Sequence, residues 1–180
     1  MPTYGDVINF WFHEIDPAQH WKKDLGFDQL IADRFAELHR QATLCELFEW
    51  RASPQGRLAE IIVLDQFSRN MYRDTSLSFA YDPQALALAQ EAVAVGADDE
   101  LSTIERTFLY MPYMHSESLK VHEVAVKLFA KNGVENNLNF EMLHKKIIEQ
   151  FGRYPHRNAI LGRESRPEEI AFLKQPDSSF

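Results

Sequence analysis

The strongest structural signal in the sequence lies in residues 53–72, SPQGRLAEIIVLDQFSRNMY. Ser53 followed by Pro54 is typical of a helix start, because serine caps free backbone N–H groups and proline has none to satisfy. The turns that follow are apolar on almost every face over 58–64, which is the pattern of a helix buried among others. We therefore expect a central helix that runs to about Tyr72.

Helical periodicity also dominates on both sides of this stretch. Apolar residues recur at helical spacing over 27–41, and a short, very apolar helix is expected over 6–14. Strand signals are scarce, and strands do not alternate with helices. The sequence therefore predicts an all-α fold of about eight helices, arranged as antiparallel pairs with short connections.

Caps and breakers mark helix boundaries in the second half of the chain. Asp82-Pro83 repeats the start signal, and Ser102 with Glu105 forms a capping-box pattern. The helix that begins there is expected to end or kink near Pro112, since proline removes a helical hydrogen bond. The segment 153–164 is expected to be irregular. Glycines are expected to close three helices, at Gly96, Gly133 and Gly152.

Length and composition fit one globular domain, expected over 1–175 with a flexible tail at 176–180. Cys45 is the only cysteine, which excludes an internal disulfide and a cysteine-based zinc site. No apolar run approaches the ~18–20 residues of a membrane span, and no signal-peptide pattern is present. We therefore expect a cytoplasmic protein that does not bind membranes.

Charge narrows the class of partner. Lys and Arg number 19 against 27 Asp and Glu, a formal net charge of −8, so nucleic acid is not an expected partner. The window 141–166 is the exception, with six basic and three acidic residues. This local excess favours a small anion or an acidic peptide.

The first candidate cluster lies on the central helix. Asp65 follows Ile61 by four residues and Ile62 by three, so a carboxylate continues the apolar stripe. Arg69 follows one turn later on the same stripe. A buried charge without a partner costs several kcal/mol, so both side chains need partners. Either the pair fixes the helix register, or it lines a polar cleft.

The second candidate cluster is 151–158, FGRYPHRN, just past a predicted helix end. Arg153 and Arg157 can each hold a carboxylate or phosphate through a bidentate fork, and His156 can act as an acid or base near neutral pH. Alternatively, these cations satisfy the helix end or pair with Asp65.

The third candidate cluster is 110–117, YMPYMHSE, which contains Tyr113, His115 and Glu117. His115 and His122 are seven residues apart, but they lack the closer spacing of a persuasive metal site, so no metal is expected. No nucleotide-binding loop and no nucleophile elbow is present, so no cofactor is expected either. A hydrogen-bonding role for His115 in a cleft wall is favoured.

Four of these motifs together give the sequence a family resemblance. The segments 7–12, 65–70, 110–117 and 151–158, followed by 161–165, resemble the bacterial domain-of-unknown-function 924 family from about Tyr4 to Leu173. The resemblance implies an all-α fold similar to tetratricopeptide-repeat domains and no established activity. The recurring polar residues of the family fall on Asp65, Gln66, Arg69, Asn70, His115, Glu117, Arg153, His156, Arg157 and Asn158.

Two functions and one structural alternative remain open. The first is binding of a small anionic ligand or acidic peptide in a cleft between Asp65/Arg69 and the loop 153–158, where the two clusters are expected to meet. The second is a hydrolase- or lyase-like enzyme that uses Asp65 with His156 or His115 as acid and base. The third is a structural polar core in a protein that interacts with other proteins. Neither the ligand nor the oligomeric state follows from the sequence.

Overall fold

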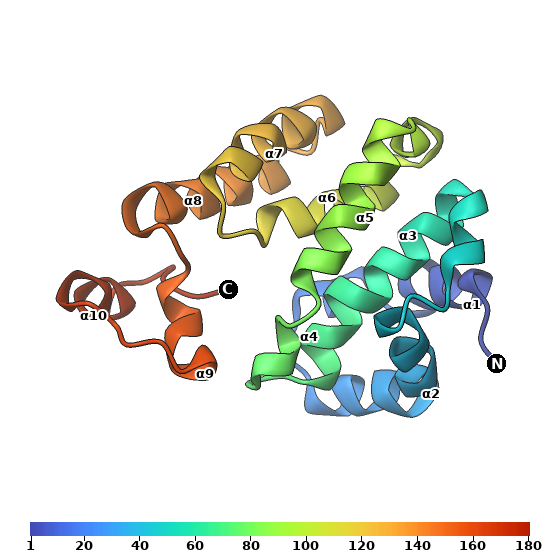
Figure 1. The fold of residues 1–180 in the computed structure, drawn as a ribbon, viewed down its shortest axis with the longest axis horizontal. Helices are drawn as coiled ribbons and strands as arrows, with labels where there is room; N and C mark the ends of the chain where they lie inside the picture. Colours follow the sequence, from blue (N-terminus) through green and yellow to red (C-terminus); the bar gives the residue numbers. More distant parts are fainter.

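The computed structural model describes all 180 residues, and every regular element in it is helical. Figure 1 shows the first helices packed together and the last helices, α9 and α10, set apart at the other end. The all-α prediction is confirmed. The main helices are α1 (Tyr4–Asn9), α2 (Leu25–Thr43), α3 (Pro54–Ile62), α5 (Asp82–Ala94), α6 (Thr103–Met114), α7 (Leu119–Asn132), α8 (Glu135–Phe151) and α10 (Pro167–Leu173).

The predicted central helix is present and is continuous with the next one. Ser53 caps it by accepting a hydrogen bond from the Gly56 N–H. After α3 the chain makes a π-helical turn at Val63–Phe67 and continues directly into the short α4 (Ser68–Met71). Helices α1, α5 and α6 pack against α3, while α2 packs against the π-helical turn and α4. The apolar run of this helix is therefore buried from several sides.

Neighbouring helices in the second half pack in chain order, α5 on α6, α6 on α7 and α7 on α8. Two of the connections contain a glycine in the left-handed region, at Gly96 and Gly133, as expected of helix-closing glycines. Helix α6 continues two residues past Pro112 and ends at Met114. No helix has the length and apolar character needed to cross a bilayer.

The segment expected to be irregular, 153–164, contains two short helical pieces. A 3-10 turn covers Pro155–Arg157, and α9 covers Asn158–Leu161. Proline stands at the first position of the turn, where its missing N–H costs nothing. Beyond α10, the side chain of Phe180 stacks on the His144 ring with centroids 3.8 Å apart.

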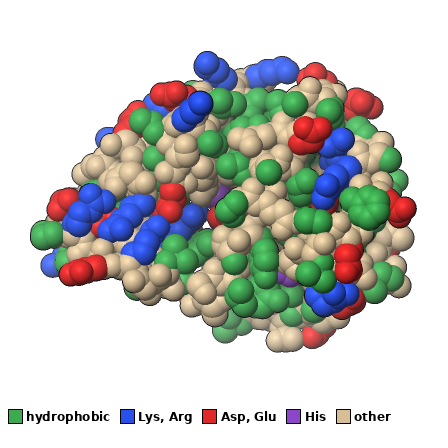
Figure 2. Space-filling model, in the orientation of Figure 1, with side chains coloured by type: hydrophobic (Ala, Val, Ile, Leu, Met, Phe, Trp, Pro, Cys, Tyr) green, Lys and Arg blue, Asp and Glu red, His purple; other side chains and the backbone are tan.

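Two hydrophobic clusters of unequal size hold the molecule together. The main core joins 29 buried residues from α1 to α7, whereas a second cluster of four lies at the end of α8 and in the loop after it. Figure 2 shows a hollow between the α9–α10 end and the α4–α5 side, with a histidine visible in its wall. Lys and Arg side chains gather beside this hollow on the α9–α10 end (Figure 2).

Candidate functional site

Asp65 lies in the middle of the π-helical turn Val63–Phe67 and is fully buried. A π-helical turn holds one extra residue within an otherwise α-helical run, and such turns are frequent at functional sites. A carboxylate therefore occupies a fully buried position within this turn.

Both carboxylate oxygens of Asp65 accept hydrogen bonds. His115 Nδ1 lies 2.7 Å from Oδ1, and Gln66 Nε2 donates to Oδ2 at 2.8 Å. Arg69 Nη1 adds a longer contact to Oδ1 at 3.3 Å. Burial alone would raise the pKa of Asp65, but its interactions with His115 and Arg69 hold that pKa below its ordinary value. Asp65 is therefore an ionised acceptor with its partners in place.

His115 caps the C-terminal end of α6, which brings it to Asp65 from the opposite wall. Its Nδ1 faces the carboxylate, whereas its Nε2 has no hydrogen-bond partner in the protein and is not fully buried. The side chain is 16% exposed. Burial and the Arg69 charge lower the pKa of His115 below its ordinary value, so the ring is neutral near pH 7.

Arg69 is neutralised by Asp82, the first residue of α5. The guanidinium donates two hydrogen bonds to the two carboxylate oxygens of Asp82, at 2.8 and 2.9 Å. A third donation goes to the Asp65 backbone carbonyl at 3.1 Å. Arg69 therefore has little donor capacity left for a ligand.

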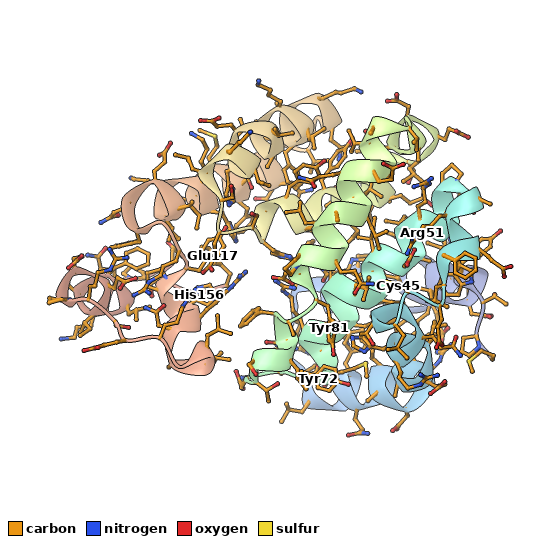
Figure 3. All side chains as sticks on the ribbon, viewed as in Figure 1. Cys45, Arg51, Tyr72, Tyr81, Glu117 and His156 are labelled. Atoms are coloured by element: carbon orange, nitrogen blue, oxygen red, sulfur yellow. The ribbon has the colours of Figure 1, made fainter.

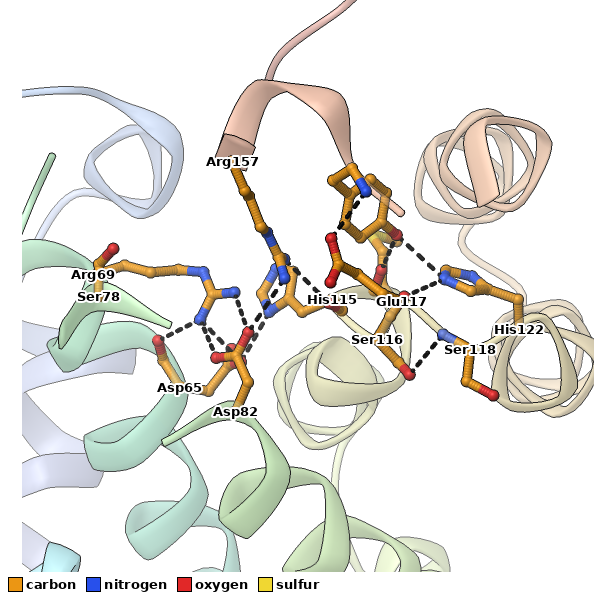
Figure 4. Close-up of polar contacts among 12 residues, drawn as sticks. Asp65, Arg69, Ser78, Asp82, His115, Ser116, Glu117, Ser118, His122 and Arg157 are labelled. Carbon is orange, nitrogen blue, oxygen red and sulfur yellow. Dashed lines mark hydrogen bonds and ion pairs between the residues drawn. The ribbon is translucent and has the colours of Figure 1, made fainter. Parts of the chain in front are cut away.

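Arg157 enters the same site from the 3-10 turn after α8 (Figure 4). Its guanidinium lies between two aromatic rings, with Cζ 4.5 Å from the centroid of Phe79 and 4.7 Å from that of Tyr154. Nη2 donates to the His115 carbonyl at 2.9 Å, and Nη1 lies 3.7 Å from Asp82, beyond hydrogen-bond range. Nε is buried and has no partner. Arg157 is thus a buried cation whose donors are largely unused.

The two clusters expected to meet do meet, but through intermediaries. The structure records no direct hydrogen bond between Asp65 or Arg69 and the loop 153–158. His115 and Asp82 make the link, since each contacts Asp65 or Arg69 on one side and Arg157 on the other. The cleft is therefore built by three segments, the π-helical turn with α4, the α6 end with the start of α5, and the turn Pro155–Arg157.

Arg153 does not reach this site. It donates to both carboxylate oxygens of Glu169 on α10, at 2.9 and 2.7 Å, and to the Glu164 carbonyl. Asn158, which is buried, donates to Ser165. The expectation that two arginine forks face one ligand is therefore wrong, because α10 supplies a buried carboxylate that occupies Arg153.

Glu117, Asn70 and Tyr113 also lie outside the Asp65–Arg157 contacts. Glu117 accepts two hydrogen bonds from Arg163, both at 2.9 Å, and one from the Tyr154 N–H. Asn70 donates to Asp28 on α2. Tyr113 is buried, and burial raises its pKa to about 12. These side chains support the walls of the site.

His156 packs among aromatic rings. Its ring lies 5.8 Å from that of Tyr154 and 5.6 Å from that of Phe180. Burial lowers the pKa of His156 to about 4, and its Nδ1 has no partner. Figure 3 shows His156 and Glu117 close together on one side of the hollow, with Tyr81 on the other. His156 is therefore neutral near pH 7 and adds no charge to an anion site.

His122 belongs to a separate set of buried hydrogen bonds. Its Nδ1 lies 2.6 Å from Glu141, and its Nε2 lies 2.7 Å from the Ser116 carbonyl and 3.0 Å from the Tyr154 hydroxyl (Figure 4). Since both ring nitrogens are occupied, His122 cannot ligate a metal together with His115. No group of three or more His, Cys, Asp or Glu side chains is placed to hold a metal ion.

The basic window 141–166 is largely neutralised by acids outside it. Three of its arginines form ion pairs with such carboxylates, Arg163 with Glu117, and Arg153 and Arg166 with Glu169. Lys145 pairs with Glu149 inside the window. Lys146 and Arg157 are the two basic residues of the window that hydrogen-bond to no carboxylate.

Comparison with known proteins assigns the family. The family model described as bacterial protein of unknown function (DUF924) matches residues 7–177 of the chain. The chain belongs to the DUF924 family. It is similar to a solved structure of a protein of unknown function from Agrobacterium tumefaciens, with 37% sequence identity, a TM-score of 0.91, and coverage of 95% of this chain and 96% of that chain. No curated protein matches the chain.

Two contributors to this DUF924 cleft were not expected from the sequence. In the sequence, Asp82 stands out only as part of a helix start. In the structure it is the carboxylate shared by Arg69 and Arg157. Phe79 forms one face of the aromatic pair around Arg157. The only sequence signal for Asp82 is its place next to Pro83 at the start of α5, and Phe79 carries none.

Proposed function

We propose that this DUF924 protein binds a small anionic ligand, a carboxylate or a phosphate, in the cleft at Arg157. The observation that carries the proposal is that most N–H donors of the Arg157 guanidinium have no hydrogen-bond partner. This guanidinium has five N–H donors and makes one hydrogen bond, although its side chain is only 8% exposed. Buried donors are ordinarily paired, and a carboxylate or phosphate matches a guanidinium edge bidentately.

The aromatic pair supports this role. Phe79 and Tyr154 cover the two faces of the guanidinium, so approach is left to its edge. A side chain held between two rings has little freedom left to lose when a ligand binds. The ring contacts also stabilise the cation without consuming its N–H donors.

The surrounding charges favour one anionic group at Arg157, with any second anionic group of the ligand directed out of the cleft. Arg69 is neutralised by Asp82, and Arg153 by Glu169, so among these three arginines Arg157 is the one without a hydrogen bond to a carboxylate. Asp65 and Asp82 would repel a second negative charge placed deeper in the cleft. The small exposed fraction of Arg157 also favours a slim small molecule over an acidic peptide.

Isothermal titration with adipate, inorganic phosphate, an acidic peptide and the neutral diamide of adipate tests the proposal. Adipate or phosphate should release or absorb heat, the diamide should not, and added salt should weaken binding. Arg157→Gln should abolish the heat. Arg157→Lys keeps the charge but loses the planar fork, so it should bind more weakly than the natural protein.

Arg57→Gln is the matched control, because Arg57 lies on α3 and takes no part in the contacts of the cleft. This variant should bind as the natural protein does. Absence of heat with every anion, in protein whose circular dichroism is unchanged, would make the cleft a structural polar core. Heat with the acidic peptide alone would replace the small ligand by a peptide partner.

We also propose that the protein works in the cytoplasm. The observation in favour is the exposed free thiol of Cys45, which a reducing compartment tolerates. Fractionation of the native host followed by detection with an antibody tests this assignment. Recovery of the protein mainly outside the cytoplasmic fraction would contradict it.

A further inference from the structure

We propose that Asp65 and His115 form a general-base pair, with which the protein hydrolyses an ester of a small carboxylate-bearing acid by water. The inference rests on the proposed function, since Arg157 would hold the carboxylate of the same molecule. It goes beyond binding because it assigns a proton transfer to Nε2 of His115.

The geometry of the pair fixes the direction of proton transfer. Asp65 is ionised and accepts from Nδ1 at 2.7 Å, so the neutral ring carries its proton on Nδ1. The lone pair then resides on Nε2, the nitrogen without a protein partner. A carboxylate behind a histidine holds the ring in this tautomer and stabilises the imidazolium that forms.

Asp65 is itself held in position. Gln66 occupies its second oxygen at 2.8 Å, and Arg69 contacts the first at 3.3 Å. Because Arg69 is also fixed by two hydrogen bonds to Asp82, the carboxylate cannot rotate without breaking several contacts. Such pre-organisation is unnecessary for a surface ion pair and is what a catalytic pair requires.

The charged groups that face His115 come from every wall of the cleft. Asp65 and Arg69 stand on the helix through the π-helical turn, Asp82 at the start of α5, and Arg157 after α8. His144 on α8 also interacts with His115, and burial lowers the pKa of His144 to about 3, so it stays neutral. The two arginine charges around His115 balance the two carboxylate charges. The His115 ring is neutral near pH 7, as a general base must be.

The absence of a side-chain nucleophile at Nε2 points to water as the reactant. No serine, threonine or cysteine forms a hydrogen bond with His115. In the step, Nε2 takes a proton from water while the water oxygen bonds to the ester carbonyl carbon. The carbon–oxygen bond to the leaving group then breaks, and the imidazolium returns its proton to the departing oxygen. Ester and water become acid and alcohol, with no other reactant.

Arg157 is close enough to place the substrate. Its Nη2 is bonded to the backbone carbonyl of His115, so its unused donors lie next to the imidazole that they would serve. A carboxylate on the Arg157 edge would therefore bring a linked ester group alongside Nε2. Esters without a carboxylate should be poorer substrates, since they lack this contact.

The test uses the mono-4-nitrophenyl ester of adipic acid and, as a neutral match, 4-nitrophenyl hexanoate. We expect the natural protein to hydrolyse the charged ester faster. His115→Gln should lower kcat/KM by about 100-fold or more, the usual share of a general base. Asp65→Asn should also lower it, and its pH profile should differ from that of the natural protein, because an amide neither fixes the same tautomer of the ring nor stabilises the imidazolium. His13→Gln, at an exposed histidine with no side-chain partner, is the control and should leave the rate unchanged.

Adipate binding separates the two proposals. His115→Gln should still bind adipate by titration, while Arg157→Gln should not. Equal rates for the natural protein and His115→Gln, or no hydrolysis by either, with adipate still bound, would overturn the general-base pair alone. Hydrolysis that depends on His115 in a protein that binds no adipate would overturn the anion site and retain the base.

Discussion

Oδ1 of Asp65 lies 2.7 Å from Nδ1 of His115, although 50 positions separate the two residues in the sequence. The contact joins the π-helical turn of the central helix to the end of α6, and both helices are packed into the main core. A bond between two rigid elements holds its geometry better than one between loops. The pair should therefore be nearly the same with and without a ligand.

Asp65→Ala should destabilise the protein by about 1–3 kcal/mol, because it leaves the donors of His115 and Gln66 buried without an acceptor. The loss stays below the ~3–5 kcal/mol of a lone buried charge, since Arg69 keeps Asp82 as its partner. Asp65→Asn should cost less than Asp65→Ala. Urea denaturation measures both, and unchanged midpoints would mean that Asp65 is not part of a buried network.

Asp82→Ala should move stability and ligand affinity in opposite directions. It removes the carboxylate shared by Arg69 and Arg157, but Arg69 keeps Asp65 as a partner, so the free energy of unfolding should fall by about 1–3 kcal/mol. The same change removes a negative charge from the cleft, so adipate should bind more tightly than to the natural protein. Thermal melting with and without adipate checks both effects, and weaker adipate binding would contradict the charge argument.

Acid should destabilise the fold well above the range in which carboxylates titrate. Burial lowers the pKa of His39 to about 4, of His144 to about 3 and of His156 to about 4, against about 6.5 in the unfolded chain. Between these values the unfolded chain binds more protons than the folded one. The free energy of unfolding should therefore fall as pH drops from about 6.5 toward 4, by up to about 1.4 kcal/mol per pH unit for each histidine.

Urea midpoints measured near pH 7 and near pH 5 test this dependence. His144→Gln should reduce the slope, whereas the exposed His13→Gln should leave it unchanged. A midpoint that does not move between these two values would show that the three buried histidines are already charged in the folded protein.

Anion affinity should be nearly constant between about pH 6 and pH 8. The sequence alone suggests that His156 gains charge near its ordinary pKa of about 6.5 and tightens binding below it. In the folded chain, burial keeps His156 neutral until about pH 4. Titration with adipate at both ends of the range checks this, and clearly tighter binding at the acid end would restore His156 to the site.

Much of the fold could be predicted from the sequence, and so could the place of Asp65. The apolar run around Ile61 and Leu64 requires a buried helix, and helical spacing puts Asp65 on its inner side. The π-helical turn could not be predicted, because its extra residue depends on how neighbouring helices pack and leaves no mark on the apolar pattern.

Most partners of the charged side chains could not be predicted from the sequence. Glu169 lies 16 residues beyond Arg153, and Glu117 lies 46 residues before Arg163. Periodicity describes neighbours along one helix, whereas these pairs form between separate elements. The sequence could therefore list the polar residues, but only the fold shows that Arg157 keeps its donors while Arg153 loses them.

Polar contacts join the wall of the cleft that carries Arg157 to the end of α6 and the residues after it. Tyr154 donates to the Met114 carbonyl, Arg157 to the His115 carbonyl, and Arg163 to Glu117. The hydrophobic cluster at this end has only four buried residues, against 29 in the main core, so the wall can detach as a small cooperative unit while the main core stays intact. Amide hydrogens of α9 and α10 should then exchange with solvent faster than those of α3, and with little dependence on denaturant.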